Sequence, residues 1–195
     1  MKIKKKNLFI YIGIFIVLLV SFLYFFLGTP KFKKKRELKK SEKIIKNKEE
    51  KIEYSFFYPA DDGEYLLSVK KKVIKKEDLI KQIREVVLEL FKGPPEGNNK
   101  FYNPFSDKLK LNELYVVDNS IAVIDVNDAI HDKLLGGSDD ELLTIYSIVN
   151  TLSYNFPFIR ATQIIINGRE AETLAGHIDI SHPVRFDSRW IRVTE

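Results

Sequence analysis

GGSDDELLTIYSIVNTLSYNFP, residues 136–157, is the stretch that decides the fold of this chain of 195 residues. Its apolar residues recur at three- and four-residue steps, which predicts a helix with one apolar face. These residues are Leu142, Ile145, Val149, Leu152 and Phe156. Ser138 followed by Glu141 is a capping-box pattern, and Pro157 ends the helix. A helix with one apolar face must cover another surface, so the stretch predicts a layered domain.

Hairpin patterns lie on both sides of this helix. After it, residues 162–166 predict a strand, Asn167-Gly168 predicts a tight type I′ turn, and residues 169–174 predict the returning strand. Before it, residues 111–117 and 121–126 predict two strands around a short polar turn. Adjacent strands joined by tight turns are antiparallel.

A further hairpin and helix open the globular part. Residues 54–58 and 65–74 predict two strands, and the lysines at 70–72 are expected in solvent. Residues 75–91 predict a second amphipathic helix that Gly93 and the following prolines end. The order hairpin, helix, hairpin, helix, hairpin predicts an α+β fold. We expect an antiparallel or mixed sheet with the two main helices packed on one face.

The charge is divided unevenly along the chain. Residues 1–54 carry 15 Lys and Arg against 5 Asp and Glu, a net charge of +10, whereas residues 55–195 carry 17 against 22, a net charge of −5. The overall basic charge therefore belongs to the N-terminal part, and we expect no nucleic-acid partner. The chain has no cysteine, which excludes disulfides, cysteine-ligated metals, a cysteine nucleophile and a cysteine-linked lipid.

The N-terminal part predicts a membrane anchor. Residues 8–27, LFIYIGIFIVLLVSFLYFFL, contain no charged residue. A helix of this length spans about 30 Å, the thickness of the hydrocarbon core of a bilayer. The alternatives are a cleaved signal peptide and a buried helix. Lysines flank the segment on both sides, so charge alone does not fix its orientation.

These patterns predict five regions. They are a short basic head (1–7), a transmembrane anchor (8–27), a basic juxtamembrane stem (28–53), a globular domain (54–183) and a C-terminal tail (184–195). A basic stem next to a membrane is typical of a segment that contacts anionic lipid head groups.

The globular part resembles the GerMN domain, a sporulation and spore germination family. The resemblance rests on FFYPADDGEYL at 56–66, FKGPPEG at 91–97, IAVIDV at 121–126, GGSDDELLTIYSIVNTL at 136–152 and INGREAETLAGHIDIS at 166–181. Its motif residues are Gly136, Gly137, Ser138, Glu141, Asn167, Gly168, Thr173, Leu174, Gly176, His177 and Asp179.

The resemblance implies a bacterial domain outside the cytoplasm, held at the membrane by a lipid or a helix. It implies a role in spore-envelope assembly and germination, a fold similar to ring-building motifs, and no established enzymatic activity. Many relatives carry two such domains or a lipid anchor, whereas one domain and an apolar segment are found here. The implied partners are envelope proteins or a second copy, with no cofactor.

Candidate sites are few. His177, Asp179 and His182 could together hold a metal, but their spacing matches no standard motif, and a polar cluster that fixes a turn is the simpler interpretation. Asp125 could act as a base or cap a turn. Asp139, Asp140 and Glu141 are explained by the electrostatics of a helix start. No nucleophile–base pair stands out, so no catalytic residue is predicted.

Two function classes remain open. A non-catalytic interaction module predicts an exposed apolar surface, for which Phe101, Tyr102, Phe105 and Trp190 are the candidates. A cell-envelope glycan- or peptide-binding domain or hydrolase predicts a pocket beside His177 and Asp179.

Overall fold

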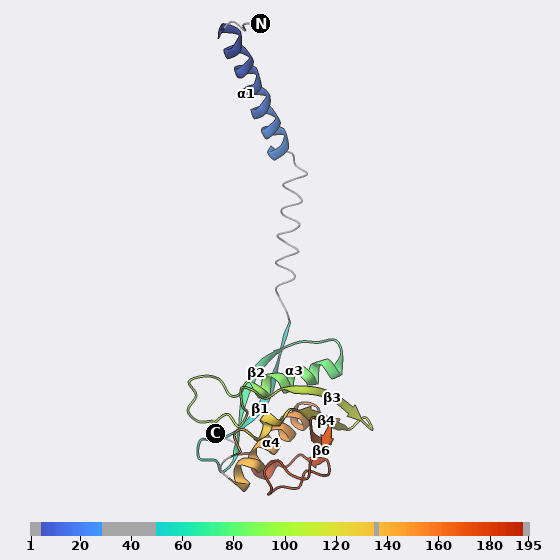
Figure 1. Ribbon diagram of the computed structural model, residues 1–195. Helices are drawn as coiled ribbons and strands as arrows, with labels where there is room; N and C mark the ends of the chain where they lie inside the picture. Colours follow the sequence, from blue (N-terminus) through green and yellow to red (C-terminus); the bar gives the residue numbers. More distant parts are fainter. Residues whose placement is uncertain (1–4, 29–49, 135–136, 193–195) are drawn as a thin grey trace. The chain divides into compact units, whose positions relative to one another are not determined.

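The computed structural model describes residues 5–28, 50–134 and 137–192 (Figure 1). The first residues of the predicted head, most of the predicted stem, Gly136 and the last three residues of the tail lie outside the described residues. The chain divides into two compact units, Met1–Glu49 and Glu50–Glu195.

The first unit contains helix α1, Lys5–Gly28. Side chains are described for residues 14–25, and the large apolar ones are exposed, Phe15, Val17 and Tyr24 by 65%, 67% and 81%. Over the part of the chain that the structure describes, no helix is both long enough and apolar enough to cross a membrane.

The second unit opens with a two-stranded sheet. Strands β1 (Lys51–Pro59) and β2 (Leu66–Ile74) pair antiparallel along their whole length. The predicted hairpin is thus confirmed, and β1 begins three residues before the predicted domain boundary at residue 54. The aromatic side chains of Phe56, Phe57 and Tyr58 are buried, which fixes the half of β1 next to the turn in the core.

Helix α3 covers Leu79–Phe91 and begins four residues later than predicted. Asp78 has an extended backbone, and its carboxylate accepts a hydrogen bond from the Lys81 N–H at 2.8 Å. Such an N-cap satisfies a backbone donor that the helix itself leaves unpaired. The predicted stop is confirmed, because Gly93 takes the left-handed conformation with φ +87° just past the end of the helix.

Lys71 corrects the expectation that all three lysines of 70–72 are solvated. Its ammonium group donates to the carbonyl oxygens of Glu89 and Gly93, both at 2.9 Å, and forms a 2.8 Å ion pair with the Glu89 carboxylate. Tyr58 adds a hydrogen bond from its hydroxyl to the Leu90 carbonyl. The small sheet therefore caps the C-terminal end of α3, whose last carbonyls have no partner within the helix.

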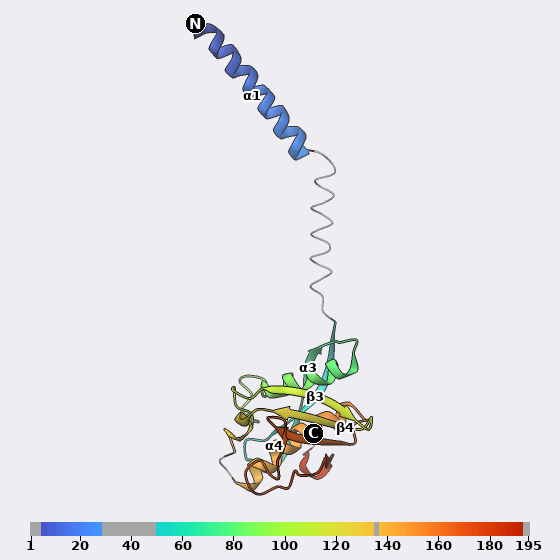
Figure 2. The ribbon, with the colours of Figure 1, turned by 45° about the vertical axis from the view of Figure 1, so that its right-hand side comes forward.

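The larger sheet is mixed. Its path is β3 (Leu111–Val117), β4 (Ile121–Val126), β5 (Ala161–Ile166) and β6 (Arg169–Glu170), while β7 (Val184–Arg185) also pairs with β5. Strands β3 and β4 lie side by side in antiparallel register (Figure 2), whereas β4 and β5 are parallel. The parallel pair follows from the connection, since α4 (Ser138–Asn155) carries the chain back between the two strands. Two 3₁₀ turns, Asp128–His131 and Ser188–Trp190, complete the unit.

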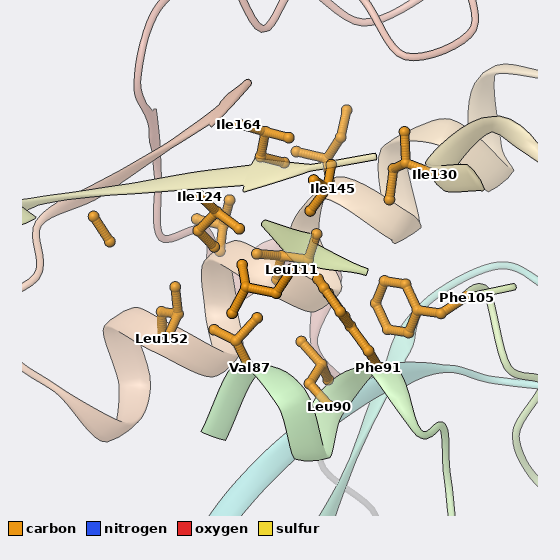
Figure 3. Packing of buried hydrophobic residues seen from close by; sticks show 14 of the residues in the cluster. Val87, Leu90, Phe91, Phe105, Leu111, Ile124, Ile130, Ile145, Leu152 and Ile164 are labelled. Atoms are coloured by element: carbon orange, nitrogen blue, oxygen red, sulfur yellow. The ribbon is translucent and has the colours of Figure 1, made fainter. Parts of the chain in front are cut away.

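Both long helices pack on one face of this sheet, as predicted. Leu114, Ile124 and Ile164 stand in register across β3, β4 and β5 and belong to the same core as α3 and α4. Figure 3 shows this cluster, with Val87 and Leu90 of α3 and Ile145 and Leu152 of α4. The α+β prediction is confirmed, but the strands form two sheets and not one.

The reason for the second sheet is the position of α4 beside β1. The Asn155 amide accepts from the Ser55 N–H at 3.0 Å and donates to the Ser55 carbonyl at 2.6 Å. Thr151 Oγ1 accepts from the Phe57 N–H at 3.1 Å. Side chains of α4 thus hydrogen-bond the backbone groups of β1 that a further strand would otherwise pair with. In the described part of the chain no strand is added on this side, so β1 is an edge strand of the small sheet.

The capping role of Lys71 predicts a difference between adjacent lysines. Lys71→Met should lower the free energy of unfolding by about 1–3 kcal/mol, because helix carbonyls and Glu89 lose a charged donor. Lys72→Met, at an exposed position of the same strand, should change it by less than about 0.5 kcal/mol. Urea unfolding followed by circular dichroism checks both. Equal effects of the two substitutions would contradict the capping role.

Candidate functional site

Residues 172–181, which belong to the last segment on which the family resemblance rests, form a compact loop. Thr173 Oγ1 accepts a hydrogen bond from the Gly176 N–H at 2.9 Å. Gly176 has φ +95°, a conformation that side chains other than glycine rarely adopt. The turn directs the backbone N–H groups of Leu174, Ala175 and His177 toward one point, an arrangement that binds anions.

Glu141 supplies the anion. Its Oε1 accepts from the N–H groups of Leu174 at 2.7 Å and Ala175 at 2.8 Å. Its Oε2 accepts from the N–H of His177 at 2.9 Å and from the His177 ring at 3.0 Å. The carboxylate is completely buried, so it joins the first turn of α4 to a loop more than thirty residues later.

His131 holds the same loop from the other direction. Its Nδ1 lies 2.6 Å from the carbonyl oxygen of Leu174, and because a carbonyl only accepts, Nδ1 carries the proton. Leu174 therefore has its N–H bound by Glu141 and its C=O bound by His131. Sequence analysis missed His131, which lies in a short irregular turn with no motif around it.

Two opposing effects set the pKa of Glu141. Burial raises it, but the backbone N–H groups of Ala175, His177 and Leu174 and the ring of His177 stabilise the charged form more strongly. The pKa is therefore below the usual value of 4.5, and the group is ionised at neutral pH. A carboxylate with four donors and no access to solvent holds the loop and is a poor proton acceptor.

The capping-box prediction is wrong. Gly137, with φ +93°, is the N-cap of α4 and makes no side-chain cap bond, and Ser138 is already helical. The Ser138 hydroxyl lies 3.4 Å from Asp139. The pattern failed because the loop of residues 174–177 offers Glu141 three N–H groups, whereas the helix start offers one. Gly136, the other glycine of the motif, lies outside the described residues.

The remaining metal candidates form a local hydrogen-bonded turn. Asp179 accepts from the N–H of Ser181 at 2.9 Å and from its hydroxyl at 2.6 Å, and the same hydroxyl lies 2.8 Å from His182 Nδ1. His177 is bound to Glu141 instead. Among the described residues, no three His, Asp or Glu side chains are arranged to hold a metal ion.

Asp125 and Asp140 also accept hydrogen bonds from residues distant in sequence. Asp125 accepts from the Gly168 N–H at 2.9 Å. The Asn167-Gly168 turn has φ +49° and φ +72°, as the predicted type I′ turn requires. Asp140 accepts from the Tyr102 hydroxyl at 2.9 Å, and burial followed by this bond raises the pKa of Tyr102.

The structure does not bring the four predicted surface aromatics together. Phe105 is fully buried and packs on Phe91 with ring centroids 5.0 Å apart, so its predicted exposure is wrong. Phe101 is half-buried against the large core. Trp190 packs on Tyr146 in a smaller cluster that also contains Phe57 and Leu66.

The comparisons with known proteins agree with this fold. A model of the Germane family, described as sporulation and spore germination, matches residues 55–172. The chain belongs to this family. The match includes Glu141 and ends just before the loop that Glu141 binds. No curated protein matches the chain.

Two solved structures show the same fold. The tandem GerMN domains of the sporulation protein GerM from Bacillus subtilis align with a TM-score of 0.51 and 23% identity, covering 71% of this chain and 46% of that one. The first GerMN domain of the same protein aligns with a TM-score of 0.52 and 19% identity, covering 69% and 97%. The chain thus spans less than half of the tandem structure.

Replacing Glu141 tests the loop's dependence on it. Glu141→Gln puts an amide donor against N–H donors and should lower the free energy of unfolding by about 2–4 kcal/mol. Asp139→Asn, an exposed acid at the same helix start, serves as the control and should have little effect. Urea unfolding at neutral pH measures both.

The ionisation of Glu141 also predicts how the free energy of unfolding depends on pH. Because the folded pKa of Glu141 is below 4.5, its ionised form adds stability above pH 4.5 and loses it as the pH falls through the folded value. The gap in unfolding free energy between wild type and Glu141→Gln should therefore shrink as the pH falls below 4.5. A difference in unfolding free energy that stays the same at acidic pH would contradict the lowered pKa of Glu141.

His177→Ala should have a smaller effect than Glu141→Gln. The substitution removes the ring donor but keeps the His177 N–H, so we expect a loss of about 0.5–1.5 kcal/mol of folding free energy. Thermal melts and the cellular phenotype should weaken together. A variant that folds normally but has lost its function would instead make His177 a site residue.

Proposed function

We propose that this protein is a membrane-anchored, extracytoplasmic module of the GerMN type that acts by binding and not by catalysis. Its role would lie in cell-envelope or spore-envelope assembly and germination, with envelope proteins or a second copy as partners. Family membership over residues 55–172 is the observation that carries the proposal.

The chemistry of the motif residues supports a non-catalytic role. Glu141, the buried acid of the family-like segment, has its carboxylate occupied by four donors. The four hollows that stand out on the described surface are lined by residues other than His177, Asp179 and His182. The alternative, a glycan or peptide hydrolase with its site near His177 and Asp179, has no such support.

Attachment through α1 is supported by sequence and exposure. Residues 8–27 contain no charge, and the large apolar side chains described between 14 and 25 are exposed. Exposed apolar side chains on a long helix are stable in lipid and costly in water. The net charge of +10 over residues 1–54 suits contact with anionic head groups.

Site-specific labelling in intact cells tests the location. The chain lacks cysteine, so Glu96→Cys places a single thiol on an exposed loop of the folded unit. This thiol should react with a membrane-impermeant maleimide in intact cells. Lys2→Cys, in the basic head that the proposed orientation places in the cytoplasm, is the matched control and should react only after lysis. The reverse pattern would overturn the orientation, and recovery in the soluble fraction would overturn the anchor.

A further inference from the structure

Two adjoining hollows form a groove on the folded unit. The larger, about 750 Å³, is lined by residues of the end of α4, of the loop before β5 and of the end of β7. The second, about 530 Å³, shares Tyr154 and Phe186 with it and continues past Phe57 and Arg192. We call the two hollows together the basic-aromatic groove, with Tyr154 and Phe186 at their junction and Arg160 and Arg185 in the larger one.

Every charged side chain that lines the groove is positive. Arg160 and Arg185 line the larger hollow, and Lys70 and Arg192 the smaller one. This contrasts with the net charge of −5 over residues 55–195. Charge of one sign gathered in a concave surface attracts ligands of the opposite sign.

Arg160 and Arg185 are exposed and, among the described residues, bind no other side chain. Lys70 is paired with Glu53 at 3.2 Å, and Arg192 stacks on the ring of Tyr65 at 3.6 Å. Within the described residues, neither Arg160 nor Arg185 has an ion pair or a side-chain hydrogen bond. The register places Arg185 opposite Ala161, the neighbour of Arg160. Two unpaired guanidinium groups lining one hollow offer planar donors that suit carboxylates.

The apolar part of the groove is also exposed. Tyr154 is 56% and Phe186 40% exposed, although the unit buries most of its other large apolar side chains. Exposed aromatic rings beside arginines are typical of binding surfaces. A ligand that is only a small anion would leave these rings in water.

We propose that the basic-aromatic groove binds an extended acidic peptide segment of a partner protein, with carboxylates on Arg160 and Arg185 and apolar side chains against Tyr154 and Phe186. The two hollows together exceed the space of one small ligand. The chain's own basic stem has the wrong charge for a groove whose charged side chains are all positive. The inference rests on the proposed role as an interaction module.

Fluorescence anisotropy of the full chain in mild detergent tests the groove. The probe is a fluorescein-labelled peptide in which Glu alternates with Phe and Tyr. Arg160→Ala combined with Arg185→Ala should weaken binding at least about tenfold. The control, Lys100→Ala with Arg169→Ala, removes two exposed charges outside the groove and should leave binding unchanged. The basic stem is present in every variant, so any binding of the acidic peptide to the stem contributes equally to all of them. Thermal melts verify that each variant folds.

Charge reversal makes the test specific. Arg160→Glu with Arg185→Glu should transfer binding from the acidic peptide to one in which Lys replaces Glu. Replacing the aromatic residues of the probe with Ala should weaken its binding to the wild type.

Several results would overturn the proposal. They are equal binding to the groove and control variants, no peptide binding, binding of short-chain phosphatidylglycerol through these arginines in place of the peptide, or self-association lost in the groove variant. None of these concerns the location of the domain, which the labelling experiment reads separately.

Discussion

The burial of α4 on nearly every side is the constraint on which the rest of the folded unit depends. Three buried hydroxyls of this helix, on Thr144, Ser147 and Ser153, have no hydrogen-bond partner among the described residues. Unpaired buried polar groups cost free energy, so the buried polar side chains that do find partners matter for the stability of the unit. Those on α4 include Glu141, Asn150 and Thr151. Each of them hydrogen-bonds the backbone of a segment distant in sequence.

The three attachments organise different parts of the chain. Glu141 holds the loop of residues 174–177. Asn150 binds both the N–H and the C=O of Asp187, at 3.0 and 2.9 Å, and so keeps the C-terminal segment in the fold. Thr151 and Asn155 bind the edge of β1. The family-like residues thus act as structural links, which leaves the molecular surface to carry recognition.

The parts predicted from sequence are those set by local patterns. The strands at 111–117 and 121–126, the Asn167-Gly168 turn and the two long helices follow from periodicity and turn chemistry. The predictions that were wrong concern residues whose partners lie far away in the sequence. Glu141 fits a capping box, and only the fold shows that a remote loop outcompetes the helix start for its carboxylate. Lys71 and Phe105 likewise look exposed until α3 is placed beside them. The basic-aromatic groove joins residues from three separate elements, so no local signal marks it.

The side chains of α4 along β1 also have a protective consequence. A strand at the edge of a sheet can pair with a strand of another molecule, and KIEYSFFYP, the sequence of β1, is rich in the aromatic residues that favour such pairing. Asn155 and Thr151 occupy the backbone groups of Ser55 and Phe57 that an incoming strand would use. The helix therefore shields this edge from aggregation, and detachment of its C-terminal turns would expose an adhesive strand.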